Sequence, residues 1–256
     1  MIRLAIPKNE IYKPLFEECE NYCSTRNIKY YRLSESQCTD YLLRNLVDAA
    51  FISPLGYGKG VKIADFRIIP GPILFTEDYT ELATIYFKQN LENVSSIQSN
   101  TPDDFIMIIA QLLLKEKFGI DLKLEQNSGP RAEILSKHDS AILWGKEKTD
   151  DVTLDVSEEW FDLVEEPLPL GFWVCRAENY PPNIKQIVSG IASHSLPEKE
   201  EIEEQIVGES KHLPRKGLLY WKWSSNLETS IETVLLFLYV HQVLSEIPAV
   251  KILERD

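Results

Sequence analysis

Long apolar runs, histidine and positive charge are all scarce in this sequence. The longest apolar stretch, VLLFLYV at 234–240, is far shorter than the roughly 20 residues that span a bilayer. The first ten residues lack the apolar core and small-residue cleavage site of a secretory signal peptide. The four histidines are scattered without the spacing of a metal-binding motif. We therefore expect a cytoplasmic protein with no membrane insertion, no bound metal and no cofactor.

The shortage of positive charge limits the possible partners. The chain has 27 lysines and arginines against 40 aspartates and glutamates, which gives a net charge of −13. Nucleic-acid binding depends on neutralising many phosphates, so this composition argues against a nucleic-acid partner. The acidity mostly favours solubility.

Cysteine is also sparse, with four residues in 256. Cys19 and Cys23 are four apart, so a helix would place them on one face. No further ligands accompany them in the sequence, and Cys38 and Cys175 have no local partner. Buried, reduced thiols are the preferred interpretation.

The first part of the chain alternates between strand and helix patterns. Strands are predicted at 2–7, 28–33 and 48–55, with helices at 12–26 and 34–47 between them. Ser34 is the expected N-cap of the second helix. A further short strand follows, broken at Gly71–Pro72. This β-α-β-α-β order predicts parallel strands covered by helices.

A second α/β series occupies the middle of the chain. Its clearest element is a helix over 101–119, in which Thr101 is the expected cap and Gly119 the end. A later helix is predicted to begin with Ser157 as its cap. The remaining predictions are strands at 81–88, 94–99, 120–126, 140–145 and 167–176, and helices at 129–138, 156–165, 183–194, 198–210 and 227–247.

Two of these strands, 81–88 and 167–176, bracket the second series. A chain that leaves one lobe, builds another and returns needs two such crossing strands. The sequence therefore predicts an α/β protein of two lobes with a cleft between them. The first lobe would comprise 1–83 and 175–256, and the second 84–174. This arrangement is that of the type II periplasmic-binding-protein-like fold.

A series of short blocks, in order along the chain, narrows this further: KNEIYKPL (8–15), DAAFISPLGYG (48–58), QLLLKEKFG (111–119), SAILWGK (140–146), and LDVSEEW (154–160) with LPLGFWVC (168–175). In these blocks the chain resembles the chorismate dehydratase and dihydroxynaphthoate synthase family of the futalosine route to menaquinone. It is closer to the dehydratase branch, since the opening SPCPND motif of the synthases is absent.

The resemblance implies a lyase that dehydrates chorismate, in which the enzyme mostly positions and polarises its substrate. The family's Ser and Asn in the first loop fall on Lys8 and Ile11 here, and the second Ser of its I-S-S motif is Pro54. The family's hydroxyl positions at Ser53, Tyr57 and Thr101 are retained. These departures keep open a second hypothesis, a catalytically silent binding protein on the same scaffold.

A carboxylate ligand requires hydrogen-bond donors or cations. Lys8, Ser53, Tyr57, Thr101 and Lys146 each follow a predicted strand or begin a helix at the edge where parallel strands end. We expect these five residues to converge on the cleft and to bind a small-molecule carboxylate. Asp103 and Asp104, at the start of the long helix, are more simply explained as complements of the helix dipole.

Overall fold

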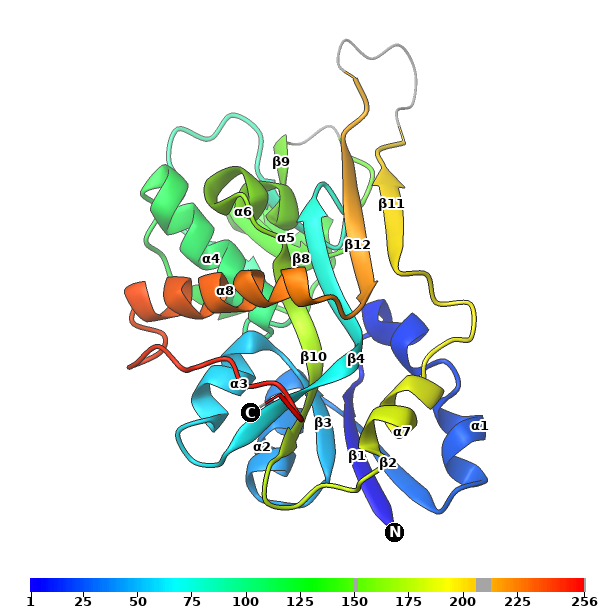
Figure 1. Cartoon of the computed structure of the whole chain (residues 1–256). Coiled ribbons are helices and arrows are strands. Elements are labelled where there is room, and N and C mark those ends of the chain that lie inside the picture. The colour runs from blue at the N-terminus through cyan, green and yellow to red at the C-terminus, as the bar shows by residue number, and fades with distance from the viewer. Residues whose placement is uncertain (150–151, 206–212, 256) are drawn as a thin grey trace. The chain divides into compact units, whose positions relative to one another are not determined.

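Figure 1 shows the computed structural model, which describes residues 1–149, 152–205 and 213–255. The chain divides into two compact units. Unit 1 comprises Met1–Phe75, Leu168–Glu200 and Leu219–Asp256, and unit 2 comprises Thr76–Pro167 and Glu201–Leu218. The boundaries predicted from the sequence lay at 83/84 and 174/175, and 201–218 was assigned to the first lobe.

The β-α-β-α-β pattern of the first 60 residues forms the parallel part of the sheet in unit 1. Strand β1 (Ile2–Pro7) pairs with β2 (Ile28–Leu33) on one side and with β3 (Ala49–Ile52) on the other, both in parallel. Helix α2 (Glu35–Leu43) leads from β2 to β3 and packs on β3. Ser34 caps α2 as predicted, in a capping box completed by Gln37.

The helix predicted over 12–26 is interrupted. A 3₁₀ helix, η1 (Glu10–Phe16), is followed by α1 (Cys19–Ser24). Pro14 lies inside this stretch and has no backbone N–H, so a continuous α-helix would lose a hydrogen bond and clash with the preceding turn. The side chain of Asn9 caps η1 by accepting from the Ile11 N–H at 3.1 Å.

Strand β4 (Phe66–Asp78) is continuous through Gly71 and Pro72, where the sequence predicted a break. The fixed φ of proline fits an extended backbone, and only its missing N–H limits pairing. The carbonyl of Gly71 still takes part, because it accepts from the Trp223 N–H at 3.0 Å. The whole sheet has the order β11-β12-β4-β10-β3-β1-β2, in which β10 (Leu168–Arg176) is antiparallel to β3.

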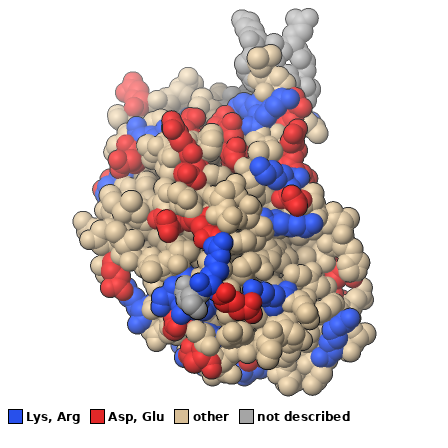
Figure 2. All heavy atoms as spheres, viewed as in Figure 1, with Lys and Arg blue, Asp and Glu red and all other residues tan. Residues whose placement is uncertain are grey.

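The prediction of a helix over 198–210 is wrong for the residues that the structure describes, and 206–210 lie outside them. Lys199–Glu203 form strand β11, and β12 (Lys216–Lys222) lies beside it in the sheet. Next to these two strands, the Glu204 N–H donates to the carbonyl of Arg215 at 2.8 Å. Charged side chains of both signs gather over these strands (Figure 2). The remaining elements of unit 1 are α3 (Pro54–Gly60), α7 (Ile184–Gly190), η2 (Ser225–Leu227) and α8 (Glu228–Val240).

Unit 2 contains a five-stranded sheet of order β7-β6-β8-β5-β9. Strands β6 (Ile97–Ser99), β7 (Leu124–Gln126) and β8 (Ser140–Trp144) are parallel, whereas β5 (Ala83–Phe87) runs antiparallel to β8 and to β9 (Val152–Asp155). The helices of this unit are α4 (Phe105–Phe118), α5 (Arg131–Lys137) and α6 (Val156–Val164).

Two helix caps in unit 2 differ from the prediction. The N-cap of helix α4 is Asp104 rather than Thr101, and its C-cap is Gly119 with φ 70°, as predicted. Helix α6 is capped by Asp155 and not by Ser157. The Asp155 carboxylate accepts from the N–H groups of Ser157 and Glu158 at 3.0 and 3.1 Å. A carboxylate reaches these N–H groups and also complements the helix dipole.

The core of unit 1 is rich in aromatic side chains. Phe51 of β3 makes edge-on contacts with Tyr12, Phe16 and Trp173, with ring centroids 5.3–5.8 Å apart. All four cysteines are free and buried, in agreement with the prediction. Within the described part of the chain, every helix is too short or too polar to cross a membrane.

Candidate functional site

The strand order of unit 1 contains a topological switch point. From β1 the chain moves to β2 on one side and then to β3 on the other. Open α/β sheets bind ligands outside the carboxyl ends of the two strands at which the order reverses. Lys8 directly follows β1 and Ser53 directly follows β3. These two predicted residues therefore flank the switch point of unit 1.

Unit 2 repeats this arrangement with different strands. From β6 the chain moves to β7 on one side and then to β8 on the other, and all three are parallel. Thr101 lies two residues after β6, and Lys146 lies two residues after β8. Four of the five predicted residues thus occupy equivalent positions in the two units.

Ser53 is held in place by the helix that it begins. Its Oγ accepts from the Gly56 N–H at 3.3 Å and caps α3, in which Pro54 is the first residue. The side chain is buried, with 7% of the residue exposed. Lys8 is fixed through its backbone N–H, which donates to Leu33 at 2.8 Å, while the residue itself is exposed. This pair combines a fixed hydroxyl with an exposed cation.

Tyr57 lies one turn into α3 and is fully buried. Its hydroxyl donates to the carbonyl of Ala249 at 3.0 Å and accepts from the Lys251 N–H at 3.0 Å. Both partners belong to the C-terminal segment of unit 1. The hydroxyl therefore holds that segment against α3 with both of its hydrogen-bonding directions in use.

Thr101 is joined to the end of β8 through Trp144. The indole Nε1 donates to Thr101 Oγ1 at 3.1 Å and to Asp104 Oδ2 at 2.9 Å. Asp104 makes no capping bond to its own helix. Among the described residues, the Thr101 hydroxyl accepts from Trp144, and its own proton can be donated to a ligand.

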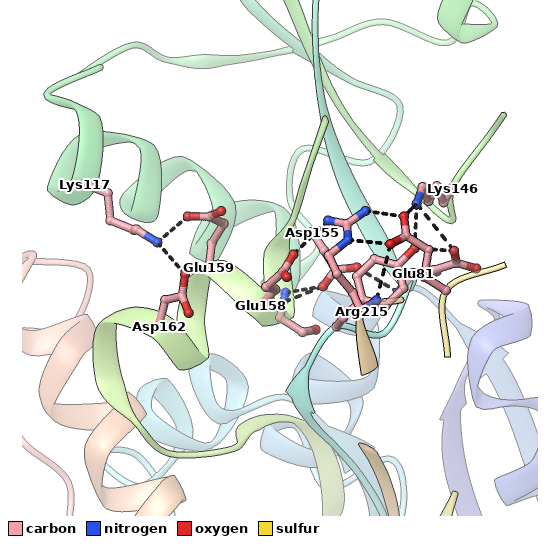
Figure 3. A network of polar contacts seen from close by, with 11 residues as sticks. Glu81, Lys117, Lys146, Asp155, Glu158, Glu159, Asp162 and Arg215 are labelled. Carbon is pink, nitrogen blue, oxygen red and sulfur yellow. Dashed lines mark hydrogen bonds and ion pairs between the residues drawn. The ribbon is translucent and has the colours of Figure 1, made fainter. Parts of the chain in front are cut away.

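Lys146 is surrounded by groups of the protein itself (Figure 3). Its ammonium donates to the Tyr79 hydroxyl at 2.6 Å and to Glu204 at 3.0 Å, and Glu81 lies 3.6 Å away. The Tyr79 hydroxyl in turn donates to Glu81. The positive charge of Lys146 is thus balanced by carboxylates of unit 2.

Arg215 completes this group, which we call the Arg215 cluster: Tyr79, Glu81, Lys146, Glu158, Glu204 and Arg215. The guanidinium binds Glu204 through two nitrogens at 2.7 and 3.0 Å, and Glu158 at 2.9 Å. It also lies over the Tyr79 ring, 4.2 Å from the centroid. These cations hold the pKa of Glu204 down, at about 2. Burial and the neighbouring Glu81 raise the pKa of Tyr79.

Sequence reasoning missed most of this cluster. Tyr79 follows a strand that was predicted to be broken, and Glu204 lay in a predicted helix. Arg215 lies beyond that helix in a stretch without periodicity. The weak signal available was the short apolar run GLLYW at 217–221, which contains two aromatic residues and is typical of a buried strand.

A separate group at the start of α6 supports the sheet of unit 2. Lys117 pairs with Glu159 and, at 3.5 Å, with Asp162 (Figure 3). Asp155, besides capping α6, accepts from the Glu81 N–H at 2.7 Å. Burial raises the pKa of Asp155 to about 7. These contacts connect α4, α6 and the chain after β4, and they explain the LDVSEEW block as a helix start.

Comparison with known proteins identifies the fold. The structure is similar to the periplasmic aliphatic sulphonate binding protein of Escherichia coli, with 10% identity, coverage of 96% of this chain and 94% of that chain, and a TM-score of 0.54. It is also similar to protein AF1704 of Archaeoglobus fulgidus, with 17% identity, coverage of 72% and 71%, and a TM-score of 0.50. No protein-family model and no curated sequence matches the chain. The chain has an α/β, periplasmic-binding-protein-like fold, as predicted.

Proposed function

We propose that the protein binds a small carboxylate at the carboxyl ends of its parallel strands. The observation that carries this proposal is the placement of Lys8 and Ser53 at the switch point between β1 and β3. Thr101 takes the equivalent position in unit 2. The resemblance to a sulphonate-binding protein supports an anionic ligand.

Tyr57 and Lys146 are not assigned to direct ligand binding in this proposal. The Tyr57 hydroxyl is engaged by two backbone groups, and the Lys146 ammonium by Glu204 and Tyr79. A ligand would have to displace these contacts to reach either side chain. We therefore assign direct ligand binding at the switch point of unit 1 to Lys8 and Ser53, and Thr101 is the corresponding candidate at the switch point of unit 2.

The finer hypothesis is dehydration of chorismate in menaquinone biosynthesis by a cytoplasmic lyase. It rests on the ordered sequence blocks that resemble the chorismate dehydratases. The buried, reduced cysteines are compatible with a cytoplasmic location. In this reaction the residues named above would orient the carboxylates, and the proton and the 4-hydroxyl would leave as water.

Titration with chorismate tests both the binding of a carboxylate and its dehydration. Binding is followed by calorimetry, and the mixture is then analysed for the dehydrated enolpyruvyl product. Product formation supports the lyase, whereas binding of chorismate that is recovered unchanged supports the silent binding protein. Absence of chorismate binding contradicts the lyase, and a thermal-shift screen of other small carboxylates then tests the silent binding protein.

Ser53→Ala and Ser34→Ala form a matched pair, since both remove a helix-capping hydroxyl from unit 1. Each should lower the free energy of unfolding by about 0.5–2 kcal/mol. Only Ser53→Ala should also weaken chorismate binding, by about 0.5–1.5 kcal/mol, the contribution of one neutral hydrogen bond. Equal affinities of the two variants would contradict the placement of the site.

A further inference from the structure

A cavity of about 490 Å³ lies in unit 1 and is built from segments other than those that carry Lys8 and Ser53. Its walls come from Pro70–Pro72 in the middle of β4, from 189–196 at the end of α7 and beyond, and from the end of β12. Backbone hydrogen bonds hold these walls. Trp223 N–H donates to Gly71 at 3.0 Å, and Ser193 N–H donates to Pro14 at 2.9 Å. The cavity is therefore part of the folded structure of unit 1.

One side of the cavity is apolar. Pro70 and Pro72 line it from β4, and Leu196 lines it from the loop after α7. The half-buried indole of Trp223 is the largest surface among them. A planar apolar group stacks well on an indole face, since ring contacts add to the area that is removed from water.

The polar side of the cavity is lined by neutral and basic residues. They are Ser189, Ser193, His194 and Lys222, and the Ser193 hydroxyl shares a hydrogen bond with Ser195 Oγ at 3.0 Å. None of the described residues that line the cavity is acidic, although the chain has 40 aspartates and glutamates and a net charge of −13. Helix α7 ends at Gly190, and its terminal carbonyls bring only a partial negative charge, about half of one charge at most. The full charge of Lys222 exceeds it.

We propose that this cavity is a second binding site, for a small planar carboxylate of the benzoate type. The ring lies against Trp223 between the two prolines. The carboxylate accepts hydrogen bonds from Lys222 and from the serine hydroxyls, which are charge-assisted and therefore strong. The volume falls within the range of roughly 300–1,000 Å³ that small-molecule pockets occupy. This site is independent of the one proposed at β1 and β3.

Calorimetric titration of the full-length protein with benzoate, and with benzamide as its uncharged analogue, tests the proposal. Benzoate should bind saturably and benzamide about tenfold more weakly, because one charge-assisted contact is lost. Lys222→Gln should weaken benzoate binding by a similar factor. Trp223→Leu should weaken both compounds. Lys216→Gln is the matched control, since Lys216 is an exposed lysine on the same strand outside the cavity.

Several outcomes would overturn this site. They are a lack of saturable benzoate binding, an unchanged affinity in both Lys222→Gln and Trp223→Leu, and an equal loss in Lys216→Gln. Ser53→Ala separates this site from the one proposed above. An unchanged benzoate affinity in Ser53→Ala, together with a loss in Lys222→Gln, supports the second site. A loss in Ser53→Ala alone places benzoate at the end of β3 and contradicts the second site.

Discussion

Removal of the Tyr57 hydroxyl tests whether its hydrogen bonds hold the C-terminal segment of unit 1 in place. Tyr57→Phe removes the partner of the Ala249 carbonyl and of the Lys251 N–H while it keeps the buried ring. Buried polar groups that lose their partner cost about 1–3 kcal/mol. We expect the free energy of unfolding, measured by urea denaturation, to fall by that amount.

Tyr239→Phe serves as the control for this prediction. Tyr239 lies on α8 of the same unit and is 41% exposed, so its hydroxyl can exchange any contact for water. Its replacement should change the free energy of unfolding by less than about 0.5 kcal/mol. If the two variants were equally stable, the Tyr57 hydroxyl would not anchor the C-terminal segment.

At the scale of elements, the Arg215 cluster ties the β11–β12 pair to the body of unit 2. The pKa of Glu204 is lowered to about 2 by Arg215 and Lys146, so the unfolded chain binds more protons than the folded chain between about pH 4.5 and 2. The contribution of Glu204 to stability is therefore complete above about pH 4.5 and is lost as the pH falls toward 2.

Glu204→Gln should remove this pH-dependent contribution. The difference between wild type and variant in the free energy of unfolding should be largest at pH 7 and should shrink steadily below about pH 4.5. Urea denaturation over this pH range measures it. Glu201→Gln, an exposed position on β11, should show no such trend. A difference that stayed constant with pH would show that the Glu204 charge does not stabilise the cluster.

The β11–β12 pair also shows why elements can be mispredicted. The run EKEEIEEQ has few apolar residues, and its charged residues are good helix formers, so local propensity favours a helix. The strand forms because β12 pairs with β11 in the sheet and Arg215 binds Glu204. Both partners lie more than ten residues away in the sequence. Tertiary pairing here overrides local propensity.

At the scale of the whole molecule, the net charge of −13 predicts a response to salt. Like charges repel one another in the compact state, and salt screens that repulsion. Raising NaCl from about 0.01 to 0.15 M shortens the Debye length from about 30 to 8 Å, and it should raise the Tm at pH 7. The effect should nearly vanish near pH 4.9, the isoelectric point.

KCl should give the same rise as NaCl, because screening does not depend on which monovalent cation is present. Differential scanning calorimetry at both pH values measures these shifts. A fall in Tm with salt at pH 7 would mean that the attractive ion pairs, such as those of Arg215, outweigh the net repulsion.

The chain passes between its two units more often than the sequence suggested. The sequence indicated two passages, in 81–88 and 167–176, whereas the unit boundaries fall within β4, just before β10, and within both β11 and β12. Strand β5 belongs to unit 2, since it pairs with β8 and β9 on its two sides. A sequence pattern identifies a strand but does not show which neighbours it pairs with.

The sequence by itself determined the two β-α-β-α-β series, the α/β class, the start of α2 and the C-terminal end of α4. Apolar periodicity and capping residues such as Ser34 and Gly119 act within a few residues of each other, so a single sequence contains them. It also placed Lys8, Ser53, Thr101 and Lys146 at strand ends. Only the tertiary structure decided that Tyr57 and Lys146 are held by Ala249, Lys251 and Glu204, because those contacts join residues 58 to 194 positions apart. Contacts at such separations depend on how the strands are ordered in the sheets, which local patterns do not specify.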